Sequence, residues 1–260
     1  VACADIGFDK IRFNPGYVGD KNKIAEVVAA CKRNGVPIRV GVNSGSVEKR
    51  VLEKFSGAAA LAESALYHVA ILEELGFYDT VISVKSSSVR ETVEAYEYLS
   101  GKCDYPLHLG VTESGSALRG AVKSSVGIGS LLLKGIGDTI RVSLTGDPCE
   151  EVKVAKLILG SLGLRDNGVE IVSCPTCSRC EYDAEKLVRT LENATSDLKK
   201  RIKIAVMGCV VNGPGEAKNA DVAVCGGKSG KIALYVRGDY VKTIDESEAE
   251  NAVLAVIDEL

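Results

Sequence analysis

The sequence predicts an α/β fold in two parts, a series of strand–helix units over residues 1–165 followed by a smaller α/β module over residues 166–260. Three observations lead to this prediction. Short β-branched runs alternate with helical patterns five times in the first part, which is typical of parallel strands joined by crossover helices. One side of each run is apolar and the other is polar. Beyond residue 166 the pattern changes, and short strands lead into cysteines.

The composition is that of an ordinary globular chain, and it argues against several kinds of partner. Hydrophobic residues make up 46% and charged residues 26% of the 260 residues, and a net charge of -3 gives no basic surface for nucleic acid. No apolar run approaches the ~20 residues that cross a bilayer, and no signal-peptide pattern is present. We therefore expect no nucleic acid, no membrane association, and a cytoplasmic protein, or one of the plastid stroma in an organism with plastids.

The nine cysteines indicate a reducing compartment. A disulfide framework is typical of short secreted chains, and this chain has neither that length nor a leader pattern. Cys3, Cys31, Cys103 and Cys149 are scattered singly, so we interpret them as small buried hydrophobic residues. The other five cysteines all lie in the smaller module.

Five strand–helix units make up the first part. Strands are expected over residues 10–14, 37–43, 80–85, 106–112 and 139–145, and helices over residues 23–34, 58–75, 89–100, 120–133 and 150–162. Residues 1–8 have the pattern of a helix end that runs into a loop. The chain is therefore expected to begin in the middle of a fold.

Each predicted strand has an apolar face and a polar face, because alternate residues of a strand point to opposite sides. The apolar faces, which we expect to meet the helices, carry Ile11, Phe13, Ile38, Val40, Val42, Ile82, Val84, Leu107, Leu109, Val111, Ile140, Val142 and Leu144. The polar faces carry Arg12, Asn14, Arg39, Gly41, Asn43, Ser83, Lys85, His108, Gly110, Thr112, Arg141, Ser143 and Thr145. The charges on these polar faces all have the same sign.

The polar faces favour the inside of a barrel over an open sheet, which would bury apolar residues on both sides. Solvated charges on an exposed sheet are the alternative, but such charges would be mixed in sign. Cations that converge on one cavity are costly without an anion, so a phosphorylated ligand is expected. A (βα)8 barrel has eight units. We predict a partial TIM-type (βα) barrel, formed by its last five βα units.

The second part is predicted to be a small α/β module, separated from the first near residues 163–167. Strands are expected over residues 169–173, 202–207, 220–225 and 231–236, with a helix over residues 184–194 and a terminal helix over residues 246–260. Between the last strand and the terminal helix the sequence predicts a polar turn. Two of the strands lead directly into cysteine-containing loops.

These two loops predict a metal site with thiolate ligands. Cys174 and Cys177 form a C-x-x-C turn, and Cys209 follows on a Gly/Pro-rich loop that also carries Glu216. Zinc, a redox dithiol and an iron–sulfur cluster held by three thiolates are the three possibilities considered. Zinc would want a fourth Cys or His ligand, and a redox dithiol would leave Cys209 without a role. Cys180 offers a second C-x-x-C with Cys177, and we rank it below Cys209 because a local trio would leave the second loop idle.

Several segments together are similar to the 4-hydroxy-3-methylbut-2-enyl diphosphate synthase family. They are residues 10–16 (KIRFNPG), 39–46 (RVGVNSGS), 83–85 (SVK), 108–115 (HLGVTESG), 135–143 (GIGDTIRVS), 174–177 (CPTC) and 208–216 (GCVVNGPGE). The resemblance implies a TIM-type barrel over residues 1–165 that binds a diphosphate and a small iron–sulfur domain over residues 166–260. It also implies that the chain lacks the first units of the barrel.

The resemblance also implies site residues. A [4Fe-4S] cluster would be held by Cys174, Cys177, Cys209 and Glu216, whose carboxylate is the exchangeable ligand. Glu113 would reach the reacting end of the substrate and donate a proton. The diphosphate pocket would be lined by Arg12, Asn14, Arg39, Asn43, Lys85, Arg141 and Ser143, and the strand pattern adds His108 and Thr112. Cys180 and Cys225 stand where the family pattern has other residues.

The activity implied is that of an iron–sulfur oxidoreductase of isoprenoid biosynthesis, in the methylerythritol phosphate pathway. It opens the ring of 2-C-methyl-D-erythritol 2,4-cyclodiphosphate and removes a hydroxyl, with electrons from ferredoxin or flavodoxin. A homodimer is expected from the same resemblance. The alternative from another class is a non-catalytic iron–sulfur or zinc module attached to a phosphate-binding barrel.

Overall fold

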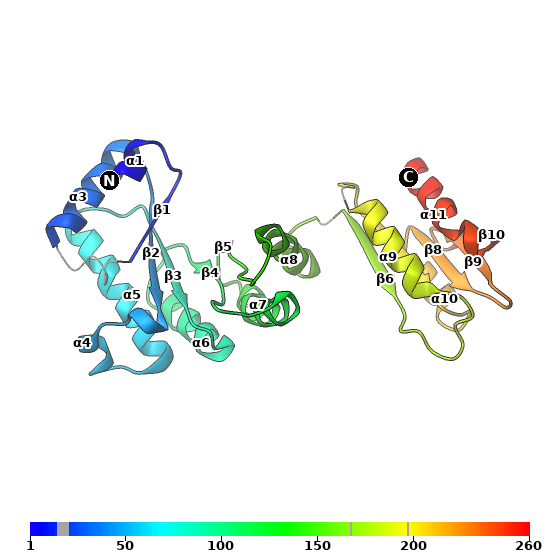
Figure 1. Ribbon diagram of the computed structural model, residues 1–260, viewed down its shortest axis with the longest axis horizontal. Helices are drawn as coiled ribbons and strands as arrows, with labels where there is room; N and C mark the ends of the chain where they lie inside the picture. Colours follow the sequence, from blue (N-terminus) through cyan, green and yellow to red (C-terminus); the bar gives the residue numbers. More distant parts are fainter. Residues whose placement is uncertain (15–20, 167, 197) are drawn as a thin grey trace. The chain divides into compact units, whose positions relative to one another are not determined.

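The chain divides into two compact units, Val1–Arg165 and Asp166–Leu260, and each is described by itself (Figure 1). The computed structural model describes residues 1–14, 21–166, 168–196 and 198–260. Pro15 and Gly16 of the first motif and Asn167 of the expected boundary lie outside these residues. Both units mix helices with strands, so the predicted α/β class is confirmed. In the part of the chain that is described, no helix combines the length and the apolar character needed to cross a membrane.

Parallel strands form the centre of the first unit. One sheet contains β1 (Ile11–Phe13), β2 (Ile38–Asn43) and β3 (Thr80–Lys85), and a second contains β4 (His108–Leu109) and β5 (Thr139–Ile140). The helices are α1 (Ala2–Asp5), α3 (Lys21–Asn34), α4 (Lys49–Leu52), α5 (Gly57–Glu74), α6 (Val89–Ser100), α7 (Ala117–Leu132) and α8 (Pro148–Ser161), with the 3-10 helix η1 (Ser44–Ser46). The five strand–helix units follow the predicted order. The sequence pattern did not predict η1 and α4, which lie in the loop after β2.

The last two strands are much shorter than predicted. Residues 106–112 and 139–145 were expected to be strands, and β4 and β5 keep two residues each. Between β3 and β4 the structure has a single bridge, Ile82 with Leu107, because side chains from α6 take up neighbouring backbone groups of both segments. The described residues of this unit do not form a closed barrel.

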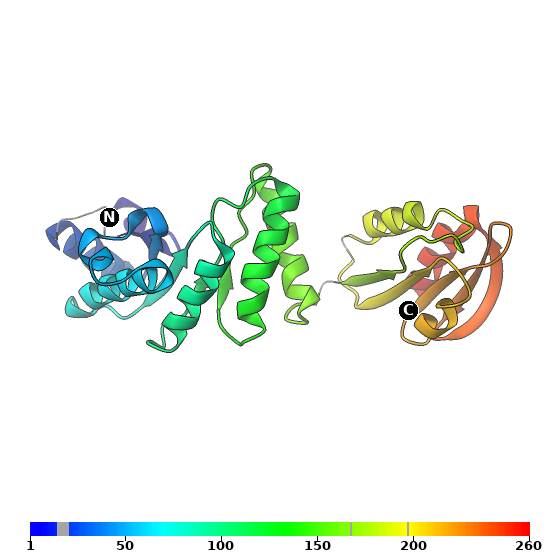
Figure 2. The same cartoon turned by 90° about the horizontal axis from the view of Figure 1, so that it is seen from below.

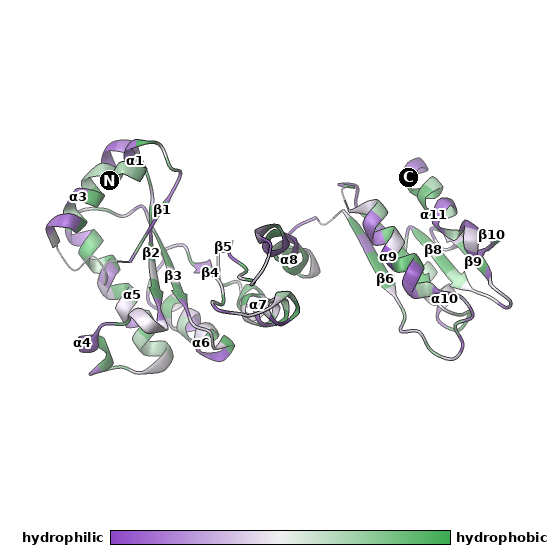
Figure 3. Cartoon of the chain, viewed as in Figure 1, coloured by the Kyte–Doolittle hydropathy of each residue, from purple (hydrophilic) through white to green (hydrophobic). Residues whose placement is uncertain are grey.

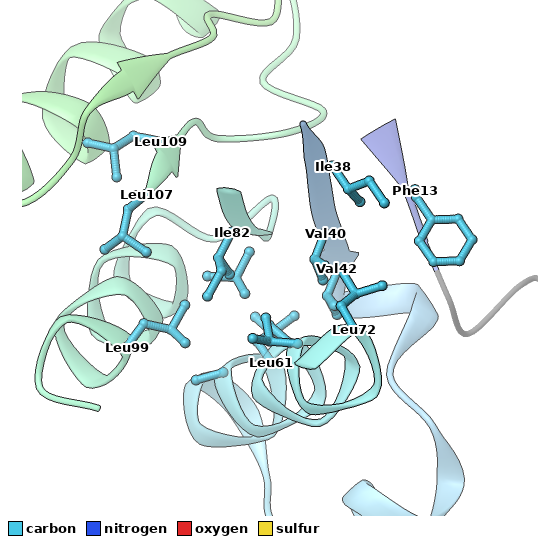
Figure 4. Close-up of a cluster of buried hydrophobic side chains, with 14 of the residues drawn as sticks. Phe13, Ile38, Val40, Val42, Leu61, Leu72, Ile82, Leu99, Leu107 and Leu109 are labelled. Atoms are coloured by element: carbon cyan, nitrogen blue, oxygen red, sulfur yellow. The ribbon is translucent and has the colours of Figure 1, made fainter. Parts of the chain in front are cut away.

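The apolar faces of the strands form the core of this unit, as predicted (Figure 4). Ile38, Val40 and Val42 of β2 are fully buried, and so is Ile82 of β3. Leu61, Leu72 and Leu99 come from α5 and α6 to cover them. Seen from below, α6, α7 and α8 follow one another along the strands (Figure 2). Burying one face of the strands in this way leaves the opposite face for polar residues.

Two of the four scattered cysteines do not behave as predicted. Cys31 is buried and Cys103 is partly buried, whereas Cys3 and Cys149 are exposed. Cys3 belongs to the short helix α1, in which Ala4 is the buried residue. Cys149 lies in the first turn of α8, where its backbone N–H donates to the capping carboxylate of Asp147 at 2.8 Å. Their exposure follows from these helix-end positions.

The second unit is a five-stranded sheet in the order β10-β9-β8-β7-β6. Its strands are β6 (Val169–Ser173), β7 (Ile202–Met207), β8 (Val222–Gly226), β9 (Lys231–Val236) and β10 (Asp239–Asp245), and the first three are parallel. Its helices are α9 (Ala184–Thr195), α10 (Gly213–Ala217), the 3-10 helix η2 (Glu246–Glu248) and α11 (Ala249–Glu259). α9 and α11 cover one face through Leu187, Leu191, Val253 and Ile257, and α10 packs on the other through Ala217. The helices are accordingly striped with hydrophilic and hydrophobic segments (Figure 3).

The predicted polar turn after residue 236 is present but is shorter than expected, because the strand β10 follows it. Val236 pairs with Asp239, so Arg237 and Gly238 make a two-residue hairpin turn. Both have positive φ, 49° and 88°, which is the conformation that matches the twist of antiparallel strands. β10 lies at the edge of the sheet and exposes every residue but Ile244, so it lacks the alternation that reveals a strand in a sequence.

Two glycines of α7 allow a test of how closely this helix approaches the segment after β5. A Cβ at Gly120 would lie 2.5 Å from Leu144 Cδ2 and 3.1 Å from Ser143 O, whereas a Cβ at Gly129 would meet no atom within 4 Å. Gly120→Ala should therefore lower the free energy of unfolding by about 1–3 kcal/mol. Gly129→Ala should raise it by about 1 kcal/mol, since alanine is the better helix former. Urea unfolding of both variants measures this, and equal effects would contradict the close approach.

Candidate functional site

Cations from neighbouring strands converge on one face of the first unit. Arg12 lies in β1, Arg39 in β2 and Lys85 at the end of β3, while Arg141 directly follows β5. A hollow of about 310 Å³ opens on this face, lined by Lys10, Arg12, Arg39, His108 and Thr139. In the described part of the chain, none of the four arginine and lysine side chains of the polar face forms an ion pair with a carboxylate. The face therefore presents positive charge that the described residues do not neutralise.

Burial and mutual repulsion lower the basicity of these groups. Lys85 is 4% exposed, and burial followed by the charges of Arg141, Arg39 and Arg12 lowers its pKa to about 7. Its Nζ has no hydrogen-bond partner among the described residues. Burial and the charge of Lys85 lower the pKa of His108 to about 3. This environment disfavours the protonated forms of Lys85 and His108, and a bound anion would favour them.

Two glycines make room for the cations. A Cβ at Gly41 would lie 2.6 Å from Arg12 Nε, and Arg12 Nη2 donates to Gly41 O at 3.2 Å. A Cβ at Gly110 would lie 2.9 Å from Lys85 Nζ and 2.7 Å from Arg141 O. Each glycine sits on the polar face of its strand, so the missing side chain is what admits the neighbouring cation.

Hydroxyl groups orient two of the basic side chains. Arg141 donates from Nε to Ser143 Oγ at 3.0 Å and also from Nη2 to the same oxygen. His108 Nδ1 and Thr139 Oγ1 are 2.8 Å apart. Ser143 is 9% exposed, so the Arg141 guanidinium is held at a nearly buried hydroxyl. These contacts fix the orientation of the Arg141 guanidinium and of the His108 imidazole.

A buried cluster that the sequence pattern did not predict anchors the loop after β2. Glu48 accepts a hydrogen bond from Ser64 Oγ at 2.7 Å and contacts His68 Nε2. His68 is 2% exposed, and burial lowers its pKa despite the nearby carboxylate. At the start of the same loop, Asn43 N donates to Ser46 Oγ at 2.9 Å. No spacing rule in the sequence links Glu48 to a helix face, so only the fold reveals this anchor.

Glu113 lies in the loop after β4 with an unusual backbone. Its φ is 53°, in the left-handed region that non-glycine residues rarely adopt, and its side chain is exposed. Thr112 N donates to Ser86 O at 3.2 Å and Ser114 Oγ donates to Val111 O at 3.2 Å, so the residues on both sides are anchored. Strain of this kind persists where the surroundings impose it, which is common at functional sites.

The structure brings only part of the predicted substrate set to the hollow. Arg12, Arg39 and His108 line it at the amino-terminal half of the strands. Asn14, Asn43, Lys85, Thr112, Arg141 and Ser143 lie further along the chain toward the carboxyl ends of their strands or beyond them. Lys10 and Thr139 line the hollow and were missed, although the same alternation that selected Arg12 and Arg141, extended by two residues, includes both.

In the second unit, three parallel strands bring cysteines to one edge of the sheet. Ser173 pairs with Val206, so Cys174 leaves β6 beside the end of β7, which leads to Cys209. Cys225 of β8 pairs with Met207 at the same edge. Burial and the neighbouring Cys174 and Cys209 raise the pKa of the Cys225 thiol to about 11. The carboxyl ends of the strands therefore collect the thiols that the sequence places far apart.

The cysteine loops pack through glycines and share one cation. Gly208 N donates to Cys174 Sγ at 3.1 Å, and a Cβ at Gly208 would lie 2.9 Å from Cys180 Sγ. Hydrogen bonds from the backbone and side chain of Arg179 lower the pKa of Cys177. Arg179 in turn has its pKa raised by Cys177 and then by Cys209, so the guanidinium lies near both thiols. Such a positive neighbour favours the thiolate form that metals bind.

The thiols are neighbours without forming a finished metal cage. Among the described residues, no three His, Cys, Asp or Glu side chains are placed so that they could hold a metal ion. Glu216 is exposed in the first turn of α10, and Cys180 Sγ donates to Tyr182 O at 3.2 Å. The donor chemistry still fits an iron–sulfur cluster, because soft thiolates from two loops meet at one sheet edge.

The comparisons with known proteins decide the family. The model described as GcpE TIM-barrel domain matches residues 1–156, and the model described as GcpE protein C-terminal domain matches residues 170–259. The chain belongs to the GcpE family. GcpE relatives named 4-hydroxy-3-methylbut-2-en-1-yl diphosphate synthase (flavodoxin) include one from Ruminiclostridium cellulolyticum, 53% identical over 100% of this chain and 73% of its own length. The protein of that name from Thermodesulfovibrio yellowstonii is 53% identical over 96% of this chain and 72% of its own length.

The family assignment confirms the resemblance drawn from the sequence motifs and favours an oxidoreductase over a non-catalytic metal module. A third relative of the same name, from Caldanaerobacter subterraneus, is 52% identical over 98% of this chain and 72% of its own length. The two GcpE domains meet where the compact units divide, between residues 156 and 170.

Lys85 should make the stability of the ligand-free GcpE chain depend on pH. Its pKa falls from 10.5 in an unfolded chain to about 7 in the folded one, so between these values the unfolded chain binds more protons. The free energy of unfolding should therefore rise as the pH increases from about 7 toward 10.5. Urea unfolding in phosphate-free buffer should show a flatter rise for Lys85→Met, while the exposed control Lys134→Met keeps it. Equal slopes for the two variants would contradict a buried Lys85 of low pKa.

Proposed function

We propose that the chain catalyses the reaction for which its relatives are named. The cyclic substrate 2-C-methyl-D-erythritol 2,4-cyclodiphosphate is opened and dehydroxylated to 4-hydroxy-3-methylbut-2-enyl diphosphate, with flavodoxin as the electron donor and ferredoxin as the alternative. One observation supports this best. The strand face of the first unit carries unpaired cations, and the buried ammonium of Lys85 has no partner among the described residues. A diphosphate supplies the anionic oxygens that such a face lacks.

In this proposal, the arginines and Lys85 bind the two phosphates. Arg141, oriented by Ser143, offers the remaining N–H groups of its guanidinium to phosphate oxygens. Burial, followed by the charges of Arg12 and Arg141, lowers the pKa of Arg39, and a bound anion relieves this repulsion. Asn14, Asn43, His108 and Thr112 add hydrogen-bonding groups around the same ligand. The polar strand face then acts as the inner wall of a partial barrel over residues 1–165.

Glu113 is proposed as the acid that protonates the departing hydroxyl. It lies beyond the end of β4, and barrel enzymes take their catalytic residues from loops at the carboxyl ends of the strands. The backbone at Glu113 is left-handed, and the residues on both sides of it are anchored. In this proposal, its exposed carboxyl reaches the ligand that Lys85 and Arg141 bind.

Residues 166–260 are proposed to hold the [4Fe-4S] cluster through Cys174, Cys177, Cys209 and Glu216. When bound, the cluster supplies single electrons and a Lewis-acidic iron. Arg179 offsets the negative charge of two of the thiolates. Glu216 is exposed at its helix, and its harder carboxylate exchanges more readily than a thiolate. We also propose that the protein acts as a homodimer, as the resemblance implies.

Arg141→Ala should impair turnover through substrate binding. Losing a charged hydrogen-bonding group should raise the KM for the cyclic diphosphate by about tenfold or more, since such a bond is worth ~1.5–3 kcal/mol. The assay is product formation by anaerobically reconstituted protein with reduced flavodoxin. Arg33→Ala is the control, because Arg33 is an exposed residue paired with Asp5. If the wild-type protein holds iron and turns over, and Arg141→Ala has the same KM, Arg141 is not part of the site. If the wild-type protein does not bind pyrophosphate, the proposed function is wrong.

The ligand assignment separates Cys209 from Cys180. Cys209→Ser should lose the cluster, and Cys180→Ser should keep it, because the Cys180 thiol is engaged with Tyr182 O while Cys209 shares Arg179 with Cys177. Iron content and the visible absorption of anaerobically reconstituted protein measure the difference. A cluster retained in Cys209→Ser and lost in Cys180→Ser would assign the ligands to the local trio. Stoichiometric zinc without iron would point to a structural metal module.

A further inference from the structure

The hydrogen-bond ladder between β3 and β4 is interrupted beyond the Ile82–Leu107 bridge. Ile82 N donates to Pro106 O at 2.9 Å before the interruption, and Thr112 N donates to Ser86 O at 3.2 Å after it. Both bonds belong to the register set by the Ile82–Leu107 bridge. In a parallel ladder of that register, one of the bonds between them would run from Val84 N to His108 O.

A side-chain hydroxyl from α6 occupies this position. Tyr96 OH accepts a hydrogen bond from Val84 N at 3.2 Å and donates one to His108 O. Tyr96 is fully buried, and burial raises the pKa of its phenol, so the hydroxyl keeps the proton it donates. One turn earlier in α6, Thr92 Oγ1 accepts from Ser86 N at 3.2 Å. Two hydroxyls of one helix therefore take the place of strand pairing along the end of β3.

The interruption lies beside two basic residues of the cationic face, Lys85 and His108. Lys85 stands between Val84 and Ser86, the two residues whose backbone N–H groups α6 binds. His108, on the other side of the inserted hydroxyl, receives the Tyr96 hydrogen bond on its own carbonyl. In the register of the Ile82–Leu107 bridge, Lys85 lies opposite Gly110 and His108 lies opposite Ser83, so the two side chains are on the same face of neighbouring strands. Burial and then the charge of Lys85 lower the pKa of His108. The separation of β3 from β4 thus sets the separation of two anion-facing groups.

We propose that Tyr96 is a positioning residue of the cationic face. Its hydroxyl holds β3 and β4 apart and so sets the spacing of Lys85 and His108. This inference rests on the proposed function of the cationic face as a diphosphate site. Without the hydroxyl, Val84 N and His108 O have each other as partners, and the ladder can close. The space for Lys85 beside Gly110 then shrinks, and this space is already narrow because a Cβ at Gly110 would lie 2.9 Å from Lys85 Nζ.

Packing alone makes a different prediction for Tyr96→Phe. Phenylalanine fills nearly the same volume, so a residue that serves only the core would tolerate the change apart from two unpaired backbone groups. If Tyr96 is a positioning residue, the loss of its hydroxyl lets Val84 N and His108 O pair with each other, and Lys85 shifts relative to His108. The position of Lys85 is therefore the quantity that separates the two roles.

The first test is the affinity of the full chain for inorganic pyrophosphate, measured by titration calorimetry. Tyr96→Phe should weaken binding by about tenfold, the equivalent of one charged hydrogen bond. Tyr98→Phe is the matched control, because Tyr98 lies on the same helix and donates to Glu63 at 2.6 Å outside the pocket, and it should leave the affinity unchanged. Equal affinity of wild type and Tyr96→Phe would overturn the inference, whereas absence of pyrophosphate binding by the wild type would overturn the proposed function.

The second test follows the Lys85 side chain by NMR of protein labelled at the lysine Cε. Its titration midpoint near pH 7 in the wild type should move upward in Tyr96→Phe, as Lys85 is displaced toward solvent. An unchanged midpoint in a folded variant would assign Tyr96 a packing role only. If Tyr96→Phe fails to fold, Thr92→Val decides, because it removes the second hydroxyl at nearly constant volume and should move the midpoint in the same direction. A folded Thr92→Val with wild-type midpoint and affinity would then overturn the inference.

Discussion

Like charge on one strand face is the constraint on which the rest of the first unit depends. Lys85 is buried among arginines, with its pKa lowered by burial and by Arg141, Arg39 and Arg12. A chain gains no stability from such an arrangement, so the apolar face of the same strands must carry the fold. Ile38, Val40 and Ile82 do so, fully buried under α5 and α6 (Figure 4). The polar face is then left for the proposed diphosphate.

Close approach of backbones is the second recurring device. Gly41 and Gly110 admit Arg12 and Lys85 on the cationic face, and Gly208 admits the thiols of Cys174 and Cys180 in the second unit. A Cβ would lie within 3 Å of Arg12 at Gly41, of Lys85 at Gly110 and of Cys180 at Gly208. The glycines of both sites therefore act through the space they leave, and their conformational freedom is secondary.

The two sites differ in how far the folded chain prepares them. The cationic face has its side chains oriented by hydroxyls of Ser143 and Thr139, and Tyr96 separates two of its strands. The thiols of the second unit share neighbours, but the described residues form no complete metal cage. This contrast is physically reasonable. Cations can be held ready by hydrogen bonds to neutral groups, whereas several thiolates at one point repel each other until a metal ion joins them.

The sequence by itself determined which side of each strand is polar, because alternation along a strand is a local property. It therefore identified Arg12, Arg39, His108 and Arg141 together, and the motifs identified the GcpE family. It did not determine where strands end or what lies between them. Tyr96 of α6 takes up a ladder position between β3 and β4, so the pairing of these strands stops at a single bridge. β10 shows no alternation in the sequence because it lies at an edge and exposes nearly every residue. Contacts of this kind, and the burial that lowers the pKa of Lys85, depend on partners that only the tertiary structure brings together.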